Sequence, residues 1–343
     1  MNDKIKIITD SGEPVDAHTP IIISASRSTD IPAFYANWFI NRLKAGYCVW
    51  YNPFNQQPMY VAFKNTKAVV FWSKNPKPLM PYLHELDERG IHYYFQFTLN
   101  DYDNEQFEPN VPAVEKRIET FKELSEKIGK EKVIWRFDPL IMTDKIGVDE
   151  LLKKVEHIGN QLNGYTEKLV FSFADIGNIY KKVENNLKRH HIHYQEFTPR
   201  TMNEFAAGLK ELNKNWHFSL AACAEEIDLK KYGIEHNRCI DGELMKRIFA
   251  EDTDFVYYLS YGKLPEKNAL FPVEIPKKET NLKDKGQRKI CGCMISKDIG
   301  MYNTCPHFCA YCYANTSKET VERNRKLYAE NQESIIGGKV YEQ

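Results

Sequence analysis

The feature that most constrains the fold is a regular alternation of short β-branched or aromatic runs with longer segments of helical periodicity. It extends from Pro20 to about Ala222. Parallel strands need long connections, which are usually helical, so this alternation predicts a parallel sheet flanked by helices. We expect an α/β fold, specifically a partial (βα)6 TIM-like barrel with a C-terminal cysteine-rich extension. The predicted strands are 20–26, 68–73, 92–99, 132–137, 168–174 and 217–222.

Amphipathic segments between these strands predict helices, and the ends of the pattern predict the domain boundaries. We expect an N-terminal segment at 1–19, the barrel at 20–262, and a connector plus the cysteine-rich C-terminal extension at 263–343. The extension begins where the pattern breaks into a proline-rich and charged stretch. A hairpin is predicted at 47–63, and helices at 33–46, 77–90, 111–129, 148–162 and 201–215.

Composition excludes several classes of protein. Hydrophobic residues make up 42% of the chain, which is typical of a folded globular protein. Lys+Arg and Asp+Glu are balanced at 47 each, which argues against strong attraction to nucleic acids. With no secretory or membrane-spanning pattern, we expect a cytoplasmic protein that does not bind membranes. In that reducing compartment the eight cysteines are better explained as metal ligands or catalytic groups than as disulfides.

Three of the eight cysteines stand close together near the C-terminus, in the stretch CPHFCAYC that covers residues 305–312. Thiolates are soft ligands that suit iron–sulfur clusters. Three thiolates at CxxxCxxC spacing would hold three irons of a 4Fe-4S cluster and leave the fourth iron without a protein ligand. The ligands predicted from this spacing are Cys305, Cys309 and Cys312.

This triple, with Tyr311 just before its last cysteine, resembles the signature of the radical S-adenosylmethionine (SAM) superfamily. The partial (βα)6 barrel is also the fold of that superfamily. The resemblance implies that SAM chelates the open iron and that the reduced cluster cleaves its sulfonium. The resulting 5′-deoxyadenosyl radical would abstract hydrogen from a small-molecule substrate of unknown identity. An electron donor such as flavodoxin or ferredoxin is implied as well.

Several longer stretches resemble a bacterial family known as domain of unknown function 1848, over about residues 20–316. They are ISASRSTDIPAFY, VVFWSKNP, FQFTLN, VIWRFDP and the CGC before the cysteine loop. The chain departs from the radical SAM pattern in three ways, and in one of them the stretch VFSFADIGN lacks a Gly-x-Ile-x-Gly-x-x-Glu pattern. Its cysteine loop is C-terminal instead of following the first strand, and FWSKNP has no Gly-Gly-Glu to hold the amino group of SAM. Lys74 and Asn75 are the candidate cofactor-binding residues in its place.

Four further cysteines are enough to close a second metal site. They would hold either a fully ligated iron–sulfur cluster that relays electrons or a structural zinc ion. A competing interpretation is a single zinc site formed by two knuckles, CGC and the last two cysteines of the loop, with Cys305 and His307 incidental. Cys48 lies in the apolar run YCVWY and is interpreted as a buried thiol. The four candidate ligands are Cys223, Cys239, Cys291 and Cys293.

Polar residues follow the apolar part of most predicted strands, at the carboxyl ends where such folds place their active sites. The sequence leaves two simpler roles open. In the first, Asp30 or its neighbour Thr29 would cap the next helix and not bind substrate. In the second, Arg136 and Asp138 would form a buried ion pair and nothing more. The candidate catalytic residues are Arg27, Gln96, Arg136 and Asp175.

The leading hypothesis is therefore a radical SAM-type enzyme. A zinc-stabilised barrel that binds a ligand without redox chemistry is the first alternative. The second is a nucleic-acid repair enzyme like the photoproduct lyases, which the neutral charge balance disfavours.

Overall fold

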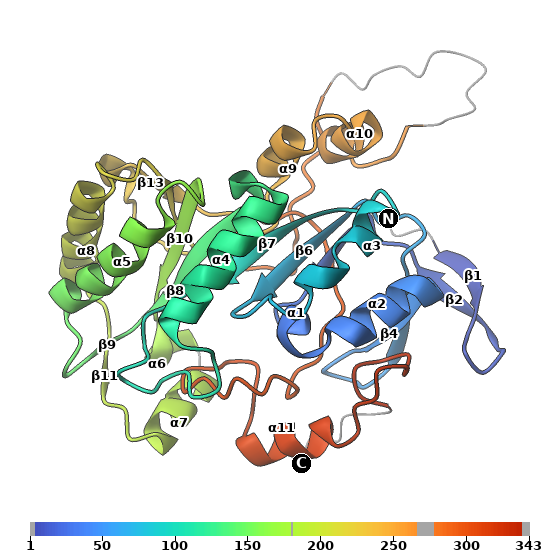
Figure 1. The fold of residues 1–343 in the computed structure, drawn as a ribbon, viewed down its shortest axis with the longest axis horizontal. Coiled ribbons are helices and arrows are strands. Elements are labelled where there is room, and N and C mark those ends of the chain that lie inside the picture. The colour runs from blue at the N-terminus through green and yellow to red at the C-terminus, as the bar shows by residue number, and fades with distance from the viewer. Residues whose placement is uncertain (1–3, 180, 266–277, 338–343) are drawn as a thin grey trace.

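The computed structural model describes residues 4–179, 181–265 and 278–337. Its centre is an eight-stranded sheet in which every neighbouring pair is parallel, in the order β13-β12-β10-β8-β7-β6-β3-β14 (Figure 1). No pairing joins β13 to β14 within the described residues, so the sheet is open. The strands are β3 (Ile22–Ala25), β6 (Ala68–Ser73), β7 (His92–Thr98), β8 (Val133–Leu140), β10 (Lys168–Phe173), β12 (Ser219–Ala222), β13 (Ile234–His236) and β14 (Lys297–Asp298).

The prediction of a mixed α/β fold with a parallel sheet is confirmed. The six predicted strands are β3, β6, β7, β8, β10 and β12, which lie side by side in chain order. Two short strands, β13 and β14, were not predicted and extend the sheet at its two edges. Three residues or fewer are too short to show a period, which is why sequence analysis missed both.

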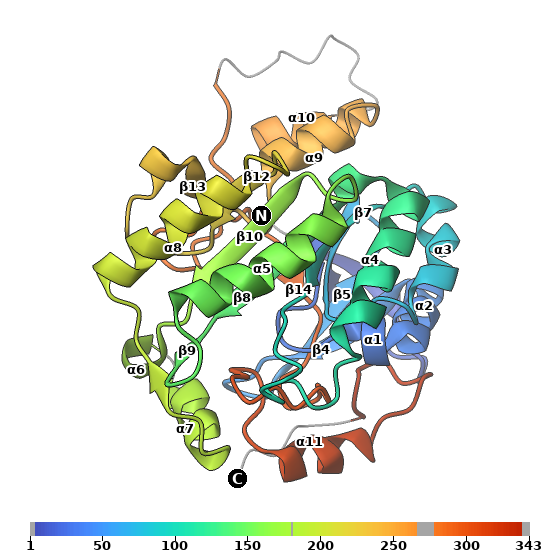
Figure 2. The same ribbon diagram turned by 60° about the vertical axis from the view of Figure 1, so that its left-hand side comes forward.

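Four helices, α2, α4, α5 and α8, cover one face of the sheet, and each buries apolar residues there (Figure 2). In α5 that stripe is Leu151, Val155, Ile158 and Leu162, and the predicted range 148–162 is confirmed. The predicted helix 77–90 is instead a 3-10 turn at Met80–Tyr82 followed by a single short helix. The helices are α1 (Ile31–Phe34), α2 (Ala36–Ala45), α3 (His84–Asp87), α4 (Val114–Ile128), α5 (Val148–Leu162), α6 (Ile176–Ile179), α7 (Lys181–Arg189), α8 (Pro199–Leu212), α9 (Gly242–Ile248), α10 (Thr253–Tyr261) and α11 (Lys318–Arg325).

Side chains on the opposite face of the sheet change from apolar to polar along β8 and β10. Successive side chains of a strand point to opposite faces, so residues two apart share a face. Near the strand starts this face carries Val70, Ile134 and Val170, which pack with residues of α9 and α10. Two residues further on, Arg136 and Ser172 follow on the same face. The carboxyl half of this face is therefore polar.

A second sheet lies beside the first, at the N-terminal end of the chain (Figure 1). It has the order β1-β2-β5-β4. The predicted hairpin at 47–63 is confirmed as the antiparallel pair β4–β5, and the N-terminal segment adds the hairpin β1–β2. The bounds are β1 (Lys4–Ile8), β2 (Pro14–His18), β4 (Tyr47–Tyr51) and β5 (Pro58–Ala62); β9 (Met142–Thr143) and β11 (Tyr194–Gln195) form a separate small sheet.

The C-terminal extension is built into the main sheet instead of standing apart from it. Its strand β14 pairs with β3, and the Asp298 carboxylate accepts hydrogen bonds from Ser24 Oγ and Arg27 N, both at 2.8 Å. Gly300 passes so close to the end of β3 that a Cβ at this position would lie 1.8 Å from Ser26 Oγ. The middle of the predicted connector, residues 266–277, lies outside the described residues.

None of the helices in the described part of the chain has the length and apolarity needed to span a membrane.

Lys297 of β14 leads to a prediction about stability. Its amine lies 3.1 Å from the Trp50 ring centroid, and burial lowers its pKa to about 8 against the opposing charges of Asp298 and Cys48. The unfolded chain therefore binds more protons than the folded protein between pH 8 and 10.5, so the stability contribution of Lys297 rises with pH there. The cost of charging it at pH 7 is on the order of 3 kcal/mol, against about 0.5–2 kcal/mol from the cation–π contact.

We expect Lys297→Met to raise the free energy of unfolding at pH 7 by about 1–2 kcal/mol. The gain should shrink between pH 8 and pH 10. Urea unfolding at pH 7 and at pH 10 measures the gain in stability. Lys6→Met is the control, because the Lys6 side chain is 70% exposed. A loss of stability at pH 7 would show that the amine is stabilising where it lies.

Candidate functional site

A cavity of about 1200 Å³ opens at the carboxyl end of the main sheet. Its wall combines the polar carboxyl half of the sheet face with residues of the C-terminal extension. Arg136, Asp138 and Ser172 contribute from the strands, and Tyr311 contributes from the cysteine loop. Seven of the eight cysteines of the chain line it: Cys223, Cys239, Cys291, Cys293, Cys305, Cys309 and Cys312.

The loop 305–312 is held at both ends by asparagine side chains that donate hydrogen bonds to its backbone carbonyls. Asn315 Nδ2 donates to the carbonyl of Cys305 at 2.7 Å, and Asn186 Nδ2 donates to that of Cys312 at 2.8 Å. Between them, Cys312 N donates to the Cys309 carbonyl at 3.1 Å and closes a turn. Burial raises the pKa of all three thiols, so a metal that binds them must displace protons.

His307 anchors the loop to the start of the first helix. Its Nε2 lies 2.8 Å from Asp30 Oδ2, and both side chains are buried. Asp30 also accepts hydrogen bonds from Ala33 N, as the N-cap of α1, and from Lys74 N. The capping role that the sequence left open for Asp30 is thus present, and it is combined with a contact to the cysteine loop.

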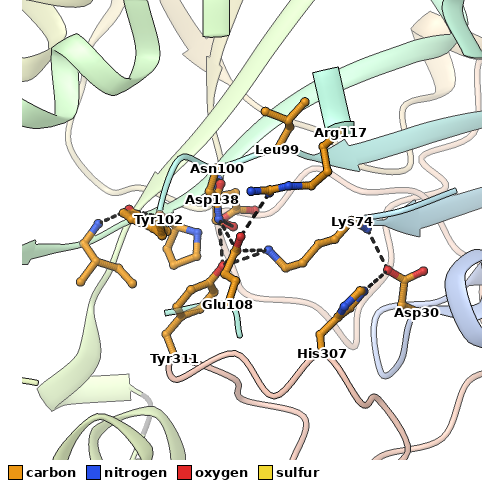
Figure 3. A network of polar contacts seen from close by, with 12 residues as sticks. Asp30, Lys74, Leu99, Asn100, Tyr102, Glu108, Arg117, Asp138, His307 and Tyr311 are labelled. Atoms are coloured by element: carbon orange, nitrogen blue, oxygen red, sulfur yellow. Dashed lines mark hydrogen bonds and ion pairs between the residues drawn. The ribbon is translucent and has the colours of Figure 1, made fainter. Parts of the chain in front are cut away.

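Tyr311, between Cys309 and Cys312, is tied to the sheet through Glu108 (Figure 3). The carboxylate of Glu108 accepts from the Tyr311 hydroxyl, from Lys74 Nζ at 2.6 Å and from Arg117 Nη1 at 3.2 Å. Asn100 Nδ2 donates both to this carboxylate, at 3.1 Å, and to the Tyr311 oxygen, at 2.9 Å. One buried carboxylate therefore joins the loop to α4 and to the segments that follow β6 and β7.

The charge of Glu108 is stabilised by these partners. Burial alone would raise the pKa of the carboxyl group, but the charges of Lys74 and Arg117 outweigh it and lower the pKa to about 2. The Glu108 side chain is only 1% exposed. Removal of this anion would leave Lys74 without a carboxylate partner, while Arg117 would keep only its ion pair with Asp103 at 3.1 Å.

The other four cavity cysteines gather at a second place. Cys223 Sγ and Cys239 Sγ are 3.6 Å apart, and Cys239 N donates to Cys293 Sγ at 3.1 Å. Cys291 interacts with Cys293 through their side chains. Contact with Cys223 and the charge of Arg136 lower the pKa of Cys239. The three loop thiols interact with one another. The competing zinc site would therefore have to combine Cys291 and Cys293 from one set with Cys309 and Cys312 from the other.

The candidate catalytic residues fall in different layers of the site. Arg27, Arg136 and Asp175 line the cavity. Arg136 forms the ion pair with Asp138 and also lines the cavity, and its catalytic role stays a prediction. Gln96 lies behind Arg136 and is buried: its Oε1 accepts from Arg136 Nη1 at 3.0 Å and its Nε2 donates to the Cys239 carbonyl at 2.9 Å.

The two candidate SAM-binding residues also separate. Lys74 lines the cavity, but its amine is engaged by Glu108 and by the Tyr311 hydroxyl at 2.9 Å. Asn75 stands in the turn after β6, where its N–H donates to Ser73 Oγ at 3.0 Å. Lys74 therefore acts on the cysteine loop in this structure.

The fit of a metal to these cysteines rests on the chemistry of the donors. Within the ranges 4–179, 181–265 and 278–337, no group of three or more histidine, cysteine, aspartate or glutamate residues is arranged as a metal site. The structure shows thiols that share one cavity in two sets, with Arg136 donating to a sulfur at 3.2 Å. A cluster carries its thiolates on separate irons, so they need not converge on one point as zinc ligands do.

Sequence analysis missed Glu108, Asp298 and Ser172. Glu108 stands in a polar loop, NDYDNEQFEPN, where nothing distinguishes a buried carboxylate from its solvated neighbours. Ser172 was within reach, because it follows Val170 by two positions and so shares its face of β10.

Comparison with known proteins identifies a family but no activity. A family model described as Domain of unknown function (DUF1848) matches residues 22–314. No curated protein matches the chain. An alpha-L-fucosidase candidate from Bacteroides thetaiotaomicron is similar at 10% identity and TM-score 0.26, over 57% of this chain and 84% of that one. A xylose isomerase-like TIM barrel/4-hydroxyphenylpyruvate dioxygenase fusion protein is similar at 12% identity and TM-score 0.25, over 62% of this chain and 32% of that one. Such low TM-scores support no argument about fold or function.

Proposed function

Because the chain belongs to the DUF1848 family, whose matched region contains all seven cavity cysteines, we propose that it is a radical SAM-type iron–sulfur enzyme. The observation that supports this proposal best is the fixed position of the CxxxCxxC loop. His307 and Tyr311 anchor it beside a cavity large enough for a cofactor and a substrate. We further propose that the open parallel sheet is a partial (βα)6 barrel whose mouth is this cavity, in a cytoplasmic protein.

In this proposal Cys305, Cys309 and Cys312 hold a 4Fe-4S cluster, which would supply the electron that cleaves SAM and generates a radical. The chain provides the walls of the reaction chamber. Asp175 is a candidate substrate ligand, because its Oδ1 is buried and has no hydrogen-bond partner among the described residues. Arg136 is held by Gln96 on its buried side and presents its ion pair with Asp138 to the cavity.

Anaerobic reconstitution with iron and sulfide tests the proposal. We expect a brown protein that binds about four irons per cluster and forms 5′-deoxyadenosine from SAM when reduced. A chemical reductant serves in this assay, and a flavodoxin or ferredoxin is the proposed physiological donor. A colourless protein that retains stoichiometric zinc would favour a zinc-stabilised binding protein instead.

A further inference from the structure

We propose that Cys223, Cys239, Cys291 and Cys293 hold an electron-transferring iron–sulfur centre whose negative charge is compensated by Arg27 and Arg136. This inference rests on the proposed function for the chemistry of the shared cavity. It goes further in assigning a redox role to the four-cysteine set and in naming the residue that tunes it. Arg27 would be a positioning residue, since it acts through the centre and not on substrate.

The sulfur of Cys239 is already surrounded as an anion would be. Arg136 Nη1 donates to it at 3.2 Å and Asn237 Nδ2 at 3.3 Å, and Cys223 Sγ is 3.6 Å away. A neutral thiol is a weak acceptor that needs no such set of donors. A thiolate bound to metal does, because its charge remains after coordination.

Arg27 is a second cation at the same place. Its guanidinium packs over the Trp72 ring, 5.2 Å from the centroid, and its Nη2 is buried with no hydrogen-bond partner among the described residues. It interacts electrostatically with Cys293 and Cys239. A buried guanidinium nitrogen without an acceptor is costly, and an anionic centre bound by these cysteines would supply the acceptor.

The position of the four cysteines suits a redox centre. All four line the cavity that the three-cysteine loop also lines, so a centre bound by them would stand in the same chamber as the proposed catalytic cluster. The charge of a zinc site does not change, because zinc is not redox-active. An iron–sulfur centre, by contrast, becomes more negative by one unit when an electron enters from a low-potential iron–sulfur or flavin donor. Fixed guanidinium charges beside the centre stabilise that reduced state and raise its reduction potential.

Arg27 is the residue to vary, because Arg136 is also bound to Asp138 and Gln96. The test uses the full chain with Cys305, Cys309 and Cys312 all changed to alanine, so that only the four-cysteine centre can load. After anaerobic reconstitution, iron and zinc are measured and the centre is titrated spectroelectrochemically. The same titration is made after adding Arg27→Gln or Arg27→Lys.

We expect the triple variant to bind iron with visible absorbance. Arg27→Gln should decrease the ratio of reduced to oxidised centre at a fixed potential about tenfold, which is about 59 mV for one electron. Arg27→Lys keeps the charge and should shift it much less. Zinc in place of iron, or equal potentials in all three proteins, would overturn this inference. If wild type fails to cleave SAM while the shift is seen, the proposed function fails and this inference stands.

Discussion

Replacing Glu108 by alanine is expected to lower the free energy of unfolding by about 3–5 kcal/mol, because Lys74 then loses its carboxylate partner and Arg117 keeps only Asp103. The Glu108 and Arg117 side chains are each 1% exposed, so bulk water does not reach their contact. Urea unfolding at pH 7 measures the loss. Glu108→Gln keeps the shape without the charge and should cost less than alanine.

The matched control is Glu123→Ala, which removes the exposed ion pair with Lys77 and should cost no more than about 1 kcal/mol. Hydrogen exchange across residues 305–312 provides a second measurement, since Glu108 accepts a hydrogen bond from Tyr311. We expect faster exchange in Glu108→Ala. Equal unfolding free energies for the two alanine variants would show that the buried network contributes no more than a surface pair.

Replacing Cys309 by alanine is expected to reduce 5′-deoxyadenosine formation to the background rate. Two cysteines cannot hold a cluster that needs three protein ligands, and SAM cleavage depends on its open iron in the proposed function. Iron content should fall by about four per protein, while iron bound by the four-cysteine set remains. Product analysis and iron determination on the reconstituted variant measure both effects.

Cys48→Ala is the control for loss of a thiol, because Cys48 is buried in β4 of the second sheet and does not line the cavity. Its SAM cleavage should match that of the wild type. Cleavage that persists in Cys309→Ala would exclude the loop as the catalytic cluster site, whatever metal the protein contains.

The central part of the fold was predictable because it depends on local periodicity. A short β-branched and aromatic run located β6 at its observed bounds, and the helical stripe located α5. The rule that active sites lie at the carboxyl ends of parallel strands brought Arg27, Arg136 and Asp175 to one cavity. These inferences needed only neighbours in sequence and one general property of parallel sheets.

The contacts that hold the cysteine loop were not predictable in the same way. Glu108 and Tyr311 are 203 residues apart, and Asp30 and His307 are 277 apart. No local pattern records which loop carboxylate becomes buried when distant segments meet. The position of Gln96 behind Arg136 was missed for a related reason, because alternation gives the face of a strand but not the depth at which a side chain ends.

Pairing of β14 with β3 has a consequence for how the protein is made. The outer edge of β3 emerges from the ribosome more than 270 residues before its partner, so the growing chain exposes unpaired backbone groups there through most of synthesis. Lys297 and Asp298 pair with that edge, and the last three cysteines follow within fourteen residues. Completion of the sheet and arrival of the three-cysteine loop would thus coincide, and a chain ending before residue 297 would have neither.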